Sequence, residues 1–166
     1  MSLVDAIFSR RSIRRYEDKD IPESVLNRIF EAGRQAPSAA NRQPVHFIVL
    51  TDLEIKKELS KGMFSRFIKD SPITIVVCAN TNDILTGKWS VIDATIALQN
   101  MVIAAWAMGV GSCWIGAFRE KKVKRLLNIP QGWKVVALAT FGYPAEQPKQ
   151  KRKKPIEELV SFNEFN

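Results

Sequence analysis

The sequence predicts an α+β domain in which a mixed β-sheet is flanked by helices. Three apolar runs, at 45–50, 73–78 and 133–141, have the length and composition of buried strands. Segments with the apolar period of helices lie between and around them. Because helices alternate with buried strands, we expect the helices to pack on a central sheet. At 166 residues the chain is expected to form one domain over 1–166, large enough to bury a substantial core.

Capping residues predict the first two helices. Ser2 with Asp5 is a capping-box-like start, and this helix is expected to end near Ser9. The proline and acid at 21–23 open a second helix, which Gly33 closes. The apolar face of the first helix comprises Leu3, Val4, Ile7 and Phe8.

A polar loop of small residues at 37–44 leads into the first predicted strand, 45–50, which we expect to be buried. Asp52 caps a third helix that Gly62 ends. The strand at 73–78 is a continuous apolar run, which predicts that both of its faces are covered.

The longest helix is predicted from Ser90 to about Met108, with Gly109 as its C′ residue. It is apolar nearly all round, so we expect it to be wholly buried, with another subunit covering part of it. Its polar residues Asp93 and Gln99 are expected to satisfy backbone or cross-subunit hydrogen bonds. A short extended segment, a basic amphipathic helix and the last strand follow, at 113–116, 120–127 and 133–141.

The residues after the last strand have a different composition. The segment 145–166 is rich in proline and lysine, and it has too few apolar residues to fold by itself. It is therefore expected to be an arm that packs on its own domain or on a partner.

No metal site is expected, because Cys78 and Cys113 lie in separate apolar runs as free thiols and His46 is the one histidine.

The net charge of +8 is concentrated in two clusters near the ends of the chain. Removing these clusters leaves a net charge of −1. Nucleic acid and a phosphorylated cofactor are the two partners that such charge suggests. Nucleic acid is disfavoured because Tyr16 is the one aromatic residue at the edge of either cluster. The clusters comprise Arg10, Arg11, Arg14 and Arg15, and Lys149, Lys151, Arg152, Lys153 and Lys154.

The first basic cluster, over 10–16, has two interpretations. Arginine presents a planar fork of donors that matches a phosphate, and Ser12 could add a hydrogen bond to the same oxygens. The cluster could therefore be a phosphate clamp at a helix–loop junction, or simply a solvated basic loop.

The N-terminus is acidic at Asp5, where a signal peptide would be basic, and the apolar run 92–110 is interrupted by Asp93. We therefore expect a cytoplasmic protein that does not span a membrane.

In its ordered set of motifs the chain resembles the FMN-dependent nitroreductase family, and the resemblance spans nearly the whole chain. It implies an intertwined homodimer with two FMN sites at the interface and the arm at about 145–166 on the partner subunit. The motifs are Arg10-Arg11-Ser12-Ile13-Arg14, the run from Glu31 to Pro44, Asp93-Ala94 with Gln99-Asn100, Gly111 to Gly116, and Gly142-Tyr143-Pro144 followed by basic residues and Pro155.

The resemblance also implies which residues bind FMN. Arg14 would sit toward the pyrimidine edge of the flavin, where positive charge stabilises the reduced ring. The FMN contacts on this segment would be Arg10, Ser12 and Arg14, with Arg11 beside them, and Lys151 and Lys153 would close over the phosphate. A loop from the other subunit would supply Pro37, Ser38, Ala39, Asn41 and Gln43, and Trp114, Ile115 and Gly116 would lie against the ring.

The resemblance implies an FMN-dependent oxidoreductase that uses NADH or NADPH to reduce small electron-poor acceptors such as nitroaromatics or quinones. No catalytic side chain is expected, since hydride transfer is the flavin's own chemistry. A protein that binds FMN for storage or regulation, without turnover, is the alternative. Longer members often place an asparagine and a lysine near the flavin between the third helix and the second strand, where this chain offers Ser65, Arg66 and Lys69.

Overall fold

A four-stranded sheet in the order β1-β2-β4-β3 runs through the middle of the computed structural model, which describes residues 1–165. The strands are β1 (Val45–Leu50), β2 (Ile73–Asn80), β3 (Gly111–Ile115) and β4 (Trp133–Gly142). The helices are α1 (Leu3–Ser9), α2 (Glu23–Arg34), α3 (Leu53–Leu59), α4 (Ser90–Ala107) and α5 (Glu120–Leu126). Short 3₁₀ turns occupy Ala39–Asn41, Arg66–Asp70, Gly87–Trp89 and Ile156–Glu158.

The sheet differs from the mixed one expected from the sequence. All three pairs of neighbouring strands are antiparallel. Within residues 1–165, a parallel pairing occurs at the isolated bridge between Ser12 and Ser112, where the arginine-rich segment lies along the edge of β3.

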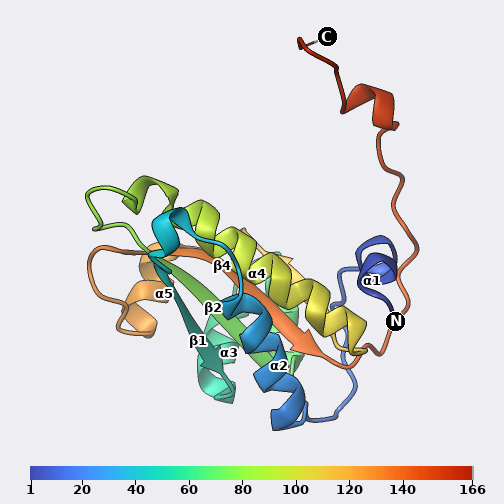
Figure 1. Cartoon of the computed structure of the whole chain (residues 1–166). Helices are drawn as coiled ribbons and strands as arrows, with labels where there is room; N and C mark the ends of the chain where they lie inside the picture. The colour runs from blue at the N-terminus through green and yellow to red at the C-terminus, as the bar shows by residue number, and fades with distance from the viewer. Residues whose placement is uncertain (166) are drawn as a thin grey trace.

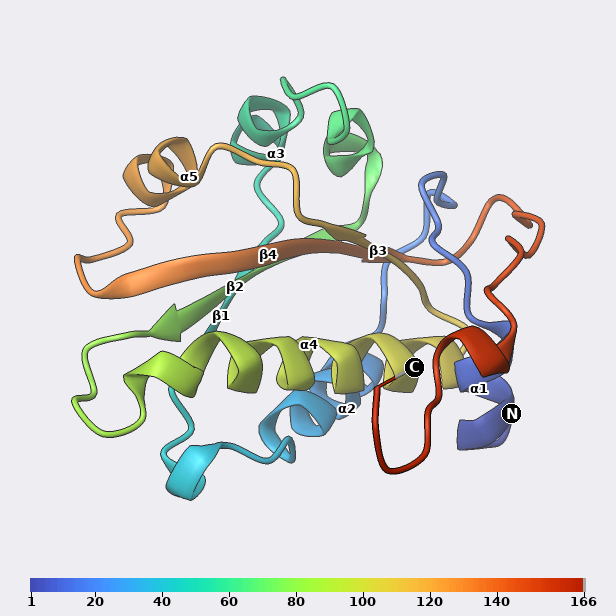
Figure 2. The ribbon, with the colours of Figure 1, turned by 90° about the horizontal axis from the view of Figure 1, so that it is seen from above.

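Helices cover both faces of the sheet, and each face has its own apolar core. Figure 2 shows α4 and α2 on one side of the strands and α3 and α5 on the other. Alternate residues of one strand serve the two cores, as in β2, where Val77 packs toward α4 and Val76 toward α3 and α5. This alternation follows from the two-residue period of a strand. The prediction that the 73–78 strand is covered on both faces is confirmed, since its residues are buried.

Strand β1 has the predicted bounds, but the prediction that it is buried is wrong. It pairs with β2 alone and so lies at an edge of the sheet. Of its six residues, Leu50 is buried and the others are half-buried or exposed. A run of apolar residues predicts a strand but does not by itself distinguish a central position from an edge.

The α1 and α4 boundaries follow the predicted caps. Ser2 and Asp5 form the capping box, and Gly109 follows α4 with a φ of +81°. The burial predicted for α4 is found on one side of the helix only. Ile92 is half exposed, and Thr95 and Gln99 on the same side are exposed as well. The apolar face of α1 is also exposed, so one chain leaves both helices without a complete partner.

Helix α4 with the turn before it, Gly87–Ala107, is long and apolar enough to cross a membrane by length and composition alone. Half of this stretch is buried inside the fold, where it packs on the sheet and on α2. The core helix of a globular domain meets the same criteria, which agrees with the buried helix predicted from Asp93.

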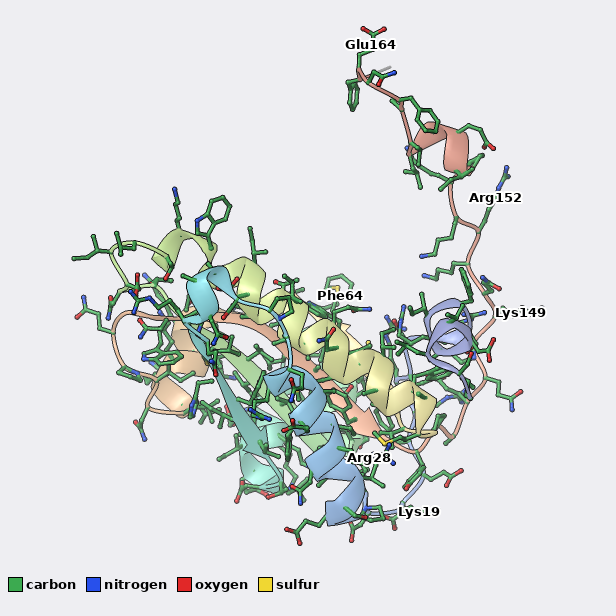
Figure 3. All side chains as sticks on the ribbon, viewed as in Figure 1. Lys19, Arg28, Phe64, Lys149, Arg152 and Glu164 are labelled. Atoms are coloured by element: carbon green, nitrogen blue, oxygen red, sulfur yellow. The ribbon has the colours of Figure 1, made fainter. Side chains whose placement is uncertain are left out.

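The C-terminal segment leaves the body of the protein after β4 (Figure 1). Every residue from 149 to 165 is exposed. Figure 3 shows Lys149 and Arg152 on this arm, with Glu164 near its end. The arm therefore lacks a packing surface of its own within one chain, as its composition predicted.

Candidate functional site

The arginine-rich segment between α1 and α2 is fixed to the sheet by its apolar and backbone groups. Ile13 is fully buried, and its N–H donates to the Ser112 carbonyl at 2.9 Å. The Tyr16 hydroxyl lies 2.6 Å from the Ile13 carbonyl, to which it donates, and 2.6 Å from the Thr140 hydroxyl. Burial raises the pKa of Tyr16, so this hydroxyl remains a donor at neutral pH. These contacts leave the side chains of Arg10 and Arg14 available to other partners.

Glu146 holds the same segment from the other side. Its Oε1 accepts from the Arg14 N–H at 2.6 Å and from the Arg15 N–H at 3.1 Å, and its Oε2 accepts from the Arg15 guanidinium at 3.2 Å. Burial alone would raise the pKa of Glu146, but these hydrogen bonds outweigh burial and lower it. This residue is not among those predicted from the sequence. The available signal was that Glu146 is the one carboxylate in the otherwise basic stretch 142–156.

The four arginines of the segment have different surroundings. Arg15 pairs with Glu146, and Arg11 Nη1 donates to the carbonyls of Phe8, Ser9 and Arg10, where it caps the end of α1. The Arg10 guanidinium forms no hydrogen bond or ion pair with any residue of 1–165, and the Arg14 guanidinium lies over the Phe67 ring at 5.8 Å. Arg10 and Arg14 are therefore the two guanidinium groups available to an anion.

Arg14 lines a cavity of about 370 Å³ at the end of β3. Trp114, Ile115 and Gly116 line the same cavity, so four of the residues predicted to bind FMN meet here. A Cβ added at Gly116 would meet no atom within 4 Å, which leaves open space over this backbone. We call this the ring-wall cavity. Its other lining residues are Met63, Phe64, Arg66, Phe67, Cys113 and Ala117.

Of the three residues that the sequence left open between α3 and β2, Arg66 lines the ring-wall cavity. Ser65 is buried, and its hydroxyl donates to the Leu59 carbonyl at 2.8 Å. Lys69 is exposed and is not part of the lining. The geometry therefore leaves Arg66 as the candidate beside Arg14.

Cys113 lies in the wall of this cavity but is 2% exposed. Burial raises the pKa of its thiol, although Arg14 and Ser12 oppose that rise. A buried thiol with a raised pKa is a poor nucleophile. Cys78 and Cys113 are both free, as predicted, and residues 1–165 contain no cluster of three or more metal-ligating side chains.

The loop at 37–43 is anchored to the start of α4. The Ala39 N–H donates to both carboxylate oxygens of Asp93, at 3.3 and 3.2 Å, which confirms the backbone partner predicted for Asp93. The Gln43 N–H donates to the Ser38 hydroxyl at 2.9 Å. Asn41 and Gln43 have φ of +53° and +52°, so the loop turns sharply and presents its amide side chains outward.

One chain does not bring this loop to the arginines. The loop is tied to Asp93, whereas the arginine-rich segment begins beside Trp106, whose Nε1 donates to the Ser9 hydroxyl at 2.9 Å. Asp93 and Trp106 lie near opposite ends of α4, roughly 20 Å apart at the helical rise per residue. Lys151 and Lys153 lie on the exposed arm and form no hydrogen bond or ion pair with any described residue.

The comparisons with known proteins match most of this chain. The model of the Nitroreductase family matches residues 7–72 and 61–143. A protein of Methanothermobacter thermautotrophicus, whose name joins NADH dehydrogenase with NAD(P)H nitroreductase, is 35% identical over 154 residues, which are 89% of this chain and 80% of that protein.

The names of two further relatives include the flavin FMN. The FMN reductase [NAD(P)H] of Bacillus subtilis strain 168 is 30% identical over 183 residues, covering 98% of this chain and 73% of that one. The solved structure of an FMN-dependent nitroreductase from Clostridium difficile R20291 is 29% identical, with a TM-score of 0.84 over 98% of this chain and 99% of that one.

Proposed function

This chain belongs to the nitroreductase family, and from that membership and its site we propose that it is an FMN-dependent oxidoreductase. NAD(P)H is the electron donor, and small electron-poor molecules such as nitroaromatics or quinones are the acceptors. The observation that carries the proposal is the ring-wall cavity, where Arg14 stands beside the Trp114–Gly116 backbone. A cofactor with an apolar ring, a polar edge and a phosphate matches this set of groups.

The residues of the site fit FMN by their chemistry. Arg10 is a guanidinium without a partner in residues 1–165, on the same segment as Ser12, and both suit a phosphate. The open backbone at Gly116 lets a flat ring approach closely. When bound, FMN would accept a hydride from the nicotinamide and pass electrons to the acceptor.

The chain's own residues would bind the flavin and orient its ring. Arg14 and Arg66 place positive charge at one side of the ring-wall cavity, which favours the reduced, negatively charged form of a ring bound there. Glu146 fixes the Arg14 backbone and so the direction from which this charge is presented. Met63, Phe64 and Phe67 add apolar surface to the lining of this cavity. We assign no catalytic acid or base.

A second copy of the chain would complete the site. The Pro37–Gln43 loop lies at one end of α4 and the arginine-rich segment at the other, so two chains with antiparallel α4 helices would bring the loop of each to the arginines of its partner. The exposed side of α4, with Ile92, Thr95 and Gln99, is the surface that such a partner would cover. We therefore propose a homodimer in which Ser38, Ala39, Asn41 and Gln43, with Pro37, contact the flavin of the other subunit.

The arm fits the same dimer. Every residue of the arm from 149 to 165 is exposed, and the apolar side chains Ile156, Leu159 and Phe162 are among them. Burying them on a partner subunit would stabilise the dimer through the hydrophobic effect. Lys151 and Lys153 would then close over the phosphate beside Arg10. We propose a cytoplasmic location, with neither nucleic acid nor a membrane as a partner.

The visible absorbance spectrum before and after anaerobic NAD(P)H tests the proposal. Purified protein should show flavin bands that bleach when NADH or NADPH is added. A colourless protein that takes up no added FMN would refute the cofactor assignment. Flavin bands that persist with both nucleotides would refute the oxidoreductase assignment and favour a storage protein.

A further inference from the structure

A second cavity, of about 520 Å³, lies beside the ring-wall cavity between the end of α3 and the start of α5. Met63 and Ala117 line both cavities, so the two adjoin. The layer of α3 and α5 is on the opposite side of the sheet from α4 (Figure 2), away from the surface proposed for the partner subunit. We call this second cavity the basic cavity.

The basic cavity is lined by Lys61, Arg119 and Lys122. Glu58 is the carboxylate that pairs with two of them: Lys61 contacts its Oε1, and Lys122 Nζ lies 3.3 Å from its Oε2. Lys122 Nζ also donates to the Glu58 carbonyl at 2.6 Å, which fixes the ammonium group in place. One carboxylate against three cations leaves an excess of positive charge at this point.

Arg119 is the unpaired cation of the three. Its side chain is exposed, and its guanidinium forms no hydrogen bond or ion pair with any residue of 1–165. A guanidinium presents a planar fork of donors that binds two oxygens of one phosphate. The cavity is therefore lined by two ammonium groups that share one carboxylate and by one guanidinium without a partner among residues 1–165.

Apart from Gly62 and Ser65, whose hydroxyl donates to the Leu59 carbonyl, the rest of the lining is apolar. Phe118 is half-buried and packs against the core beneath α3 and α5, to which the buried Leu59 and Val123 belong. An aromatic side chain beside cations suits a nucleotide, whose base is aromatic and whose ribose carries a phosphate.

We propose that the basic cavity binds the adenosine 2′-phosphate of NADPH, so that the protein prefers NADPH to NADH. The inference rests on the proposed function, since the nicotinamide must reach the ring-wall cavity past Met63 and Ala117. A phosphate monoester carries about two negative charges in one group at neutral pH. The pyrophosphate shared by NADH and NADPH is the other source of phosphate. We assign the 2′-phosphate because Lys61, Arg119 and Lys122 line one cavity, and a phosphate monoester places its negative charge in one group there.

Calorimetric titration of the full-length protein with 2′,5′-ADP and with 5′-ADP separates the two phosphates. The first probe carries the 2′-phosphate of NADPH, and the second carries the diphosphate common to both nucleotides. We expect 2′,5′-ADP to bind about tenfold more tightly, the effect of one additional charge-assisted hydrogen-bonded group. The titration needs no turnover and is run on the protein both with and without FMN.

Three variants localise the binding. Arg119→Gln should weaken binding of 2′,5′-ADP about tenfold by removing the free fork. Lys121→Gln is the matched control, because Lys121 is the neighbouring exposed cation and does not line the cavity. Glu58→Gln should strengthen binding of 2′,5′-ADP, because it removes the carboxylate that competes for Lys61 and Lys122 while keeping an acceptor for them. A purely structural role for Glu58 predicts the opposite change.

Equal affinities for 2′,5′-ADP and 5′-ADP would overturn the proposal, as would equal losses in the Arg119 and Lys121 variants. These failures are distinct from failure of the proposed function. If the flavin bleaches with NAD(P)H but the two probes bind alike, the oxidoreductase assignment stands and the phosphate assignment is wrong. If the protein holds no flavin, the cofactor assignment is wrong, and the titration still decides what the basic cavity binds.

Discussion

Glu146 gives the sharpest test of how the site is held together, because it binds the arginine-rich segment without facing the cofactor site. Glu146→Ala removes the acceptor of the Arg14 and Arg15 N–H groups, at 2.6 and 3.1 Å. Hydrogen bonds to a charged group contribute about 1.5–3 kcal/mol each when they are shielded from water. The Arg15 side chain is 77% exposed, so its ion pair with Glu146 adds little. Water can also replace part of the lost bonding, which reduces the expected cost to about 1–2 kcal/mol.

That cost should be measured as FMN affinity, because Arg14 lies on this segment and lines the cavity proposed for FMN, so a loosened segment presents its guanidinium less well. At 1.4 kcal/mol per factor of ten, the FMN dissociation constant should rise by about tenfold. The assay is titration of the flavin-free protein with FMN, followed by quenching of flavin fluorescence. Glu146→Gln keeps an acceptor oxygen and is the matched control, with a smaller expected loss.

The pH dependence of the unfolding free energy tests independently whether the Glu146 carboxylate stabilises the fold. The pKa of Glu146 is lowered from its usual 4.5, so its carboxylate form stabilises the folded state. This contribution is complete above about pH 4.5 and is lost as the pH falls through the lowered pKa. The difference in unfolding free energy between wild type and Glu146→Gln should therefore be largest near neutral pH and disappear in acid. An unchanged FMN affinity in Glu146→Ala, with no such pH-dependent difference, would refute the anchoring role.

Three further predictions concern the same region. Arg10→Ala combined with Ser12→Ala should leave purified protein with little bound flavin by absorbance, at an unchanged thermal midpoint; normal flavin content would refute the phosphate clamp. Ile13→Ala should lower the unfolding free energy by about 2–5 kcal/mol in urea, because the side chain is fully buried, whereas Ile13→Val should cost only about 0.5–1.5 kcal/mol. Cys78 and Cys113 should resist iodoacetamide in the native protein at neutral pH and react after unfolding, because burial raises the pKa of both thiols and that of Cys78 to about 11; rapid labelling of the folded protein would show that a thiol is accessible.

The local features of the chain could be predicted closely because they depend on short-range chemistry. Ser2 and Asp5 define the start of α1, Asp52 caps α3, and Gly109 ends α4 where the sequence indicated. Each of these signals acts through hydrogen bonds or backbone angles within a few residues. The buried partner of Asp93 was also predictable, since a buried carboxylate requires a donor.

Features that depend on which element lies next to which were predicted less well. The apolar run of β1 did not reveal that β1 is an edge strand with a single neighbour. The spacing of the sequence likewise gave no sign that Glu146 lies under Arg14, across more than a hundred residues. Nor did it separate Arg66 from Ser65 and Lys69, because that choice depends on which side chain faces the ring-wall cavity.

The sequence by itself determined the helices and strands, the two basic clusters, the polar loop at 37–43 and the resemblance that identifies the cofactor. These follow from periodicity, capping and charge, which are properties of neighbouring residues. Tertiary structure alone decided that Arg14 meets the Trp114–Gly116 backbone while the loop lies at the far end of α4. A residue's partner across the fold is set by the packing of the whole core, and no local pattern records it.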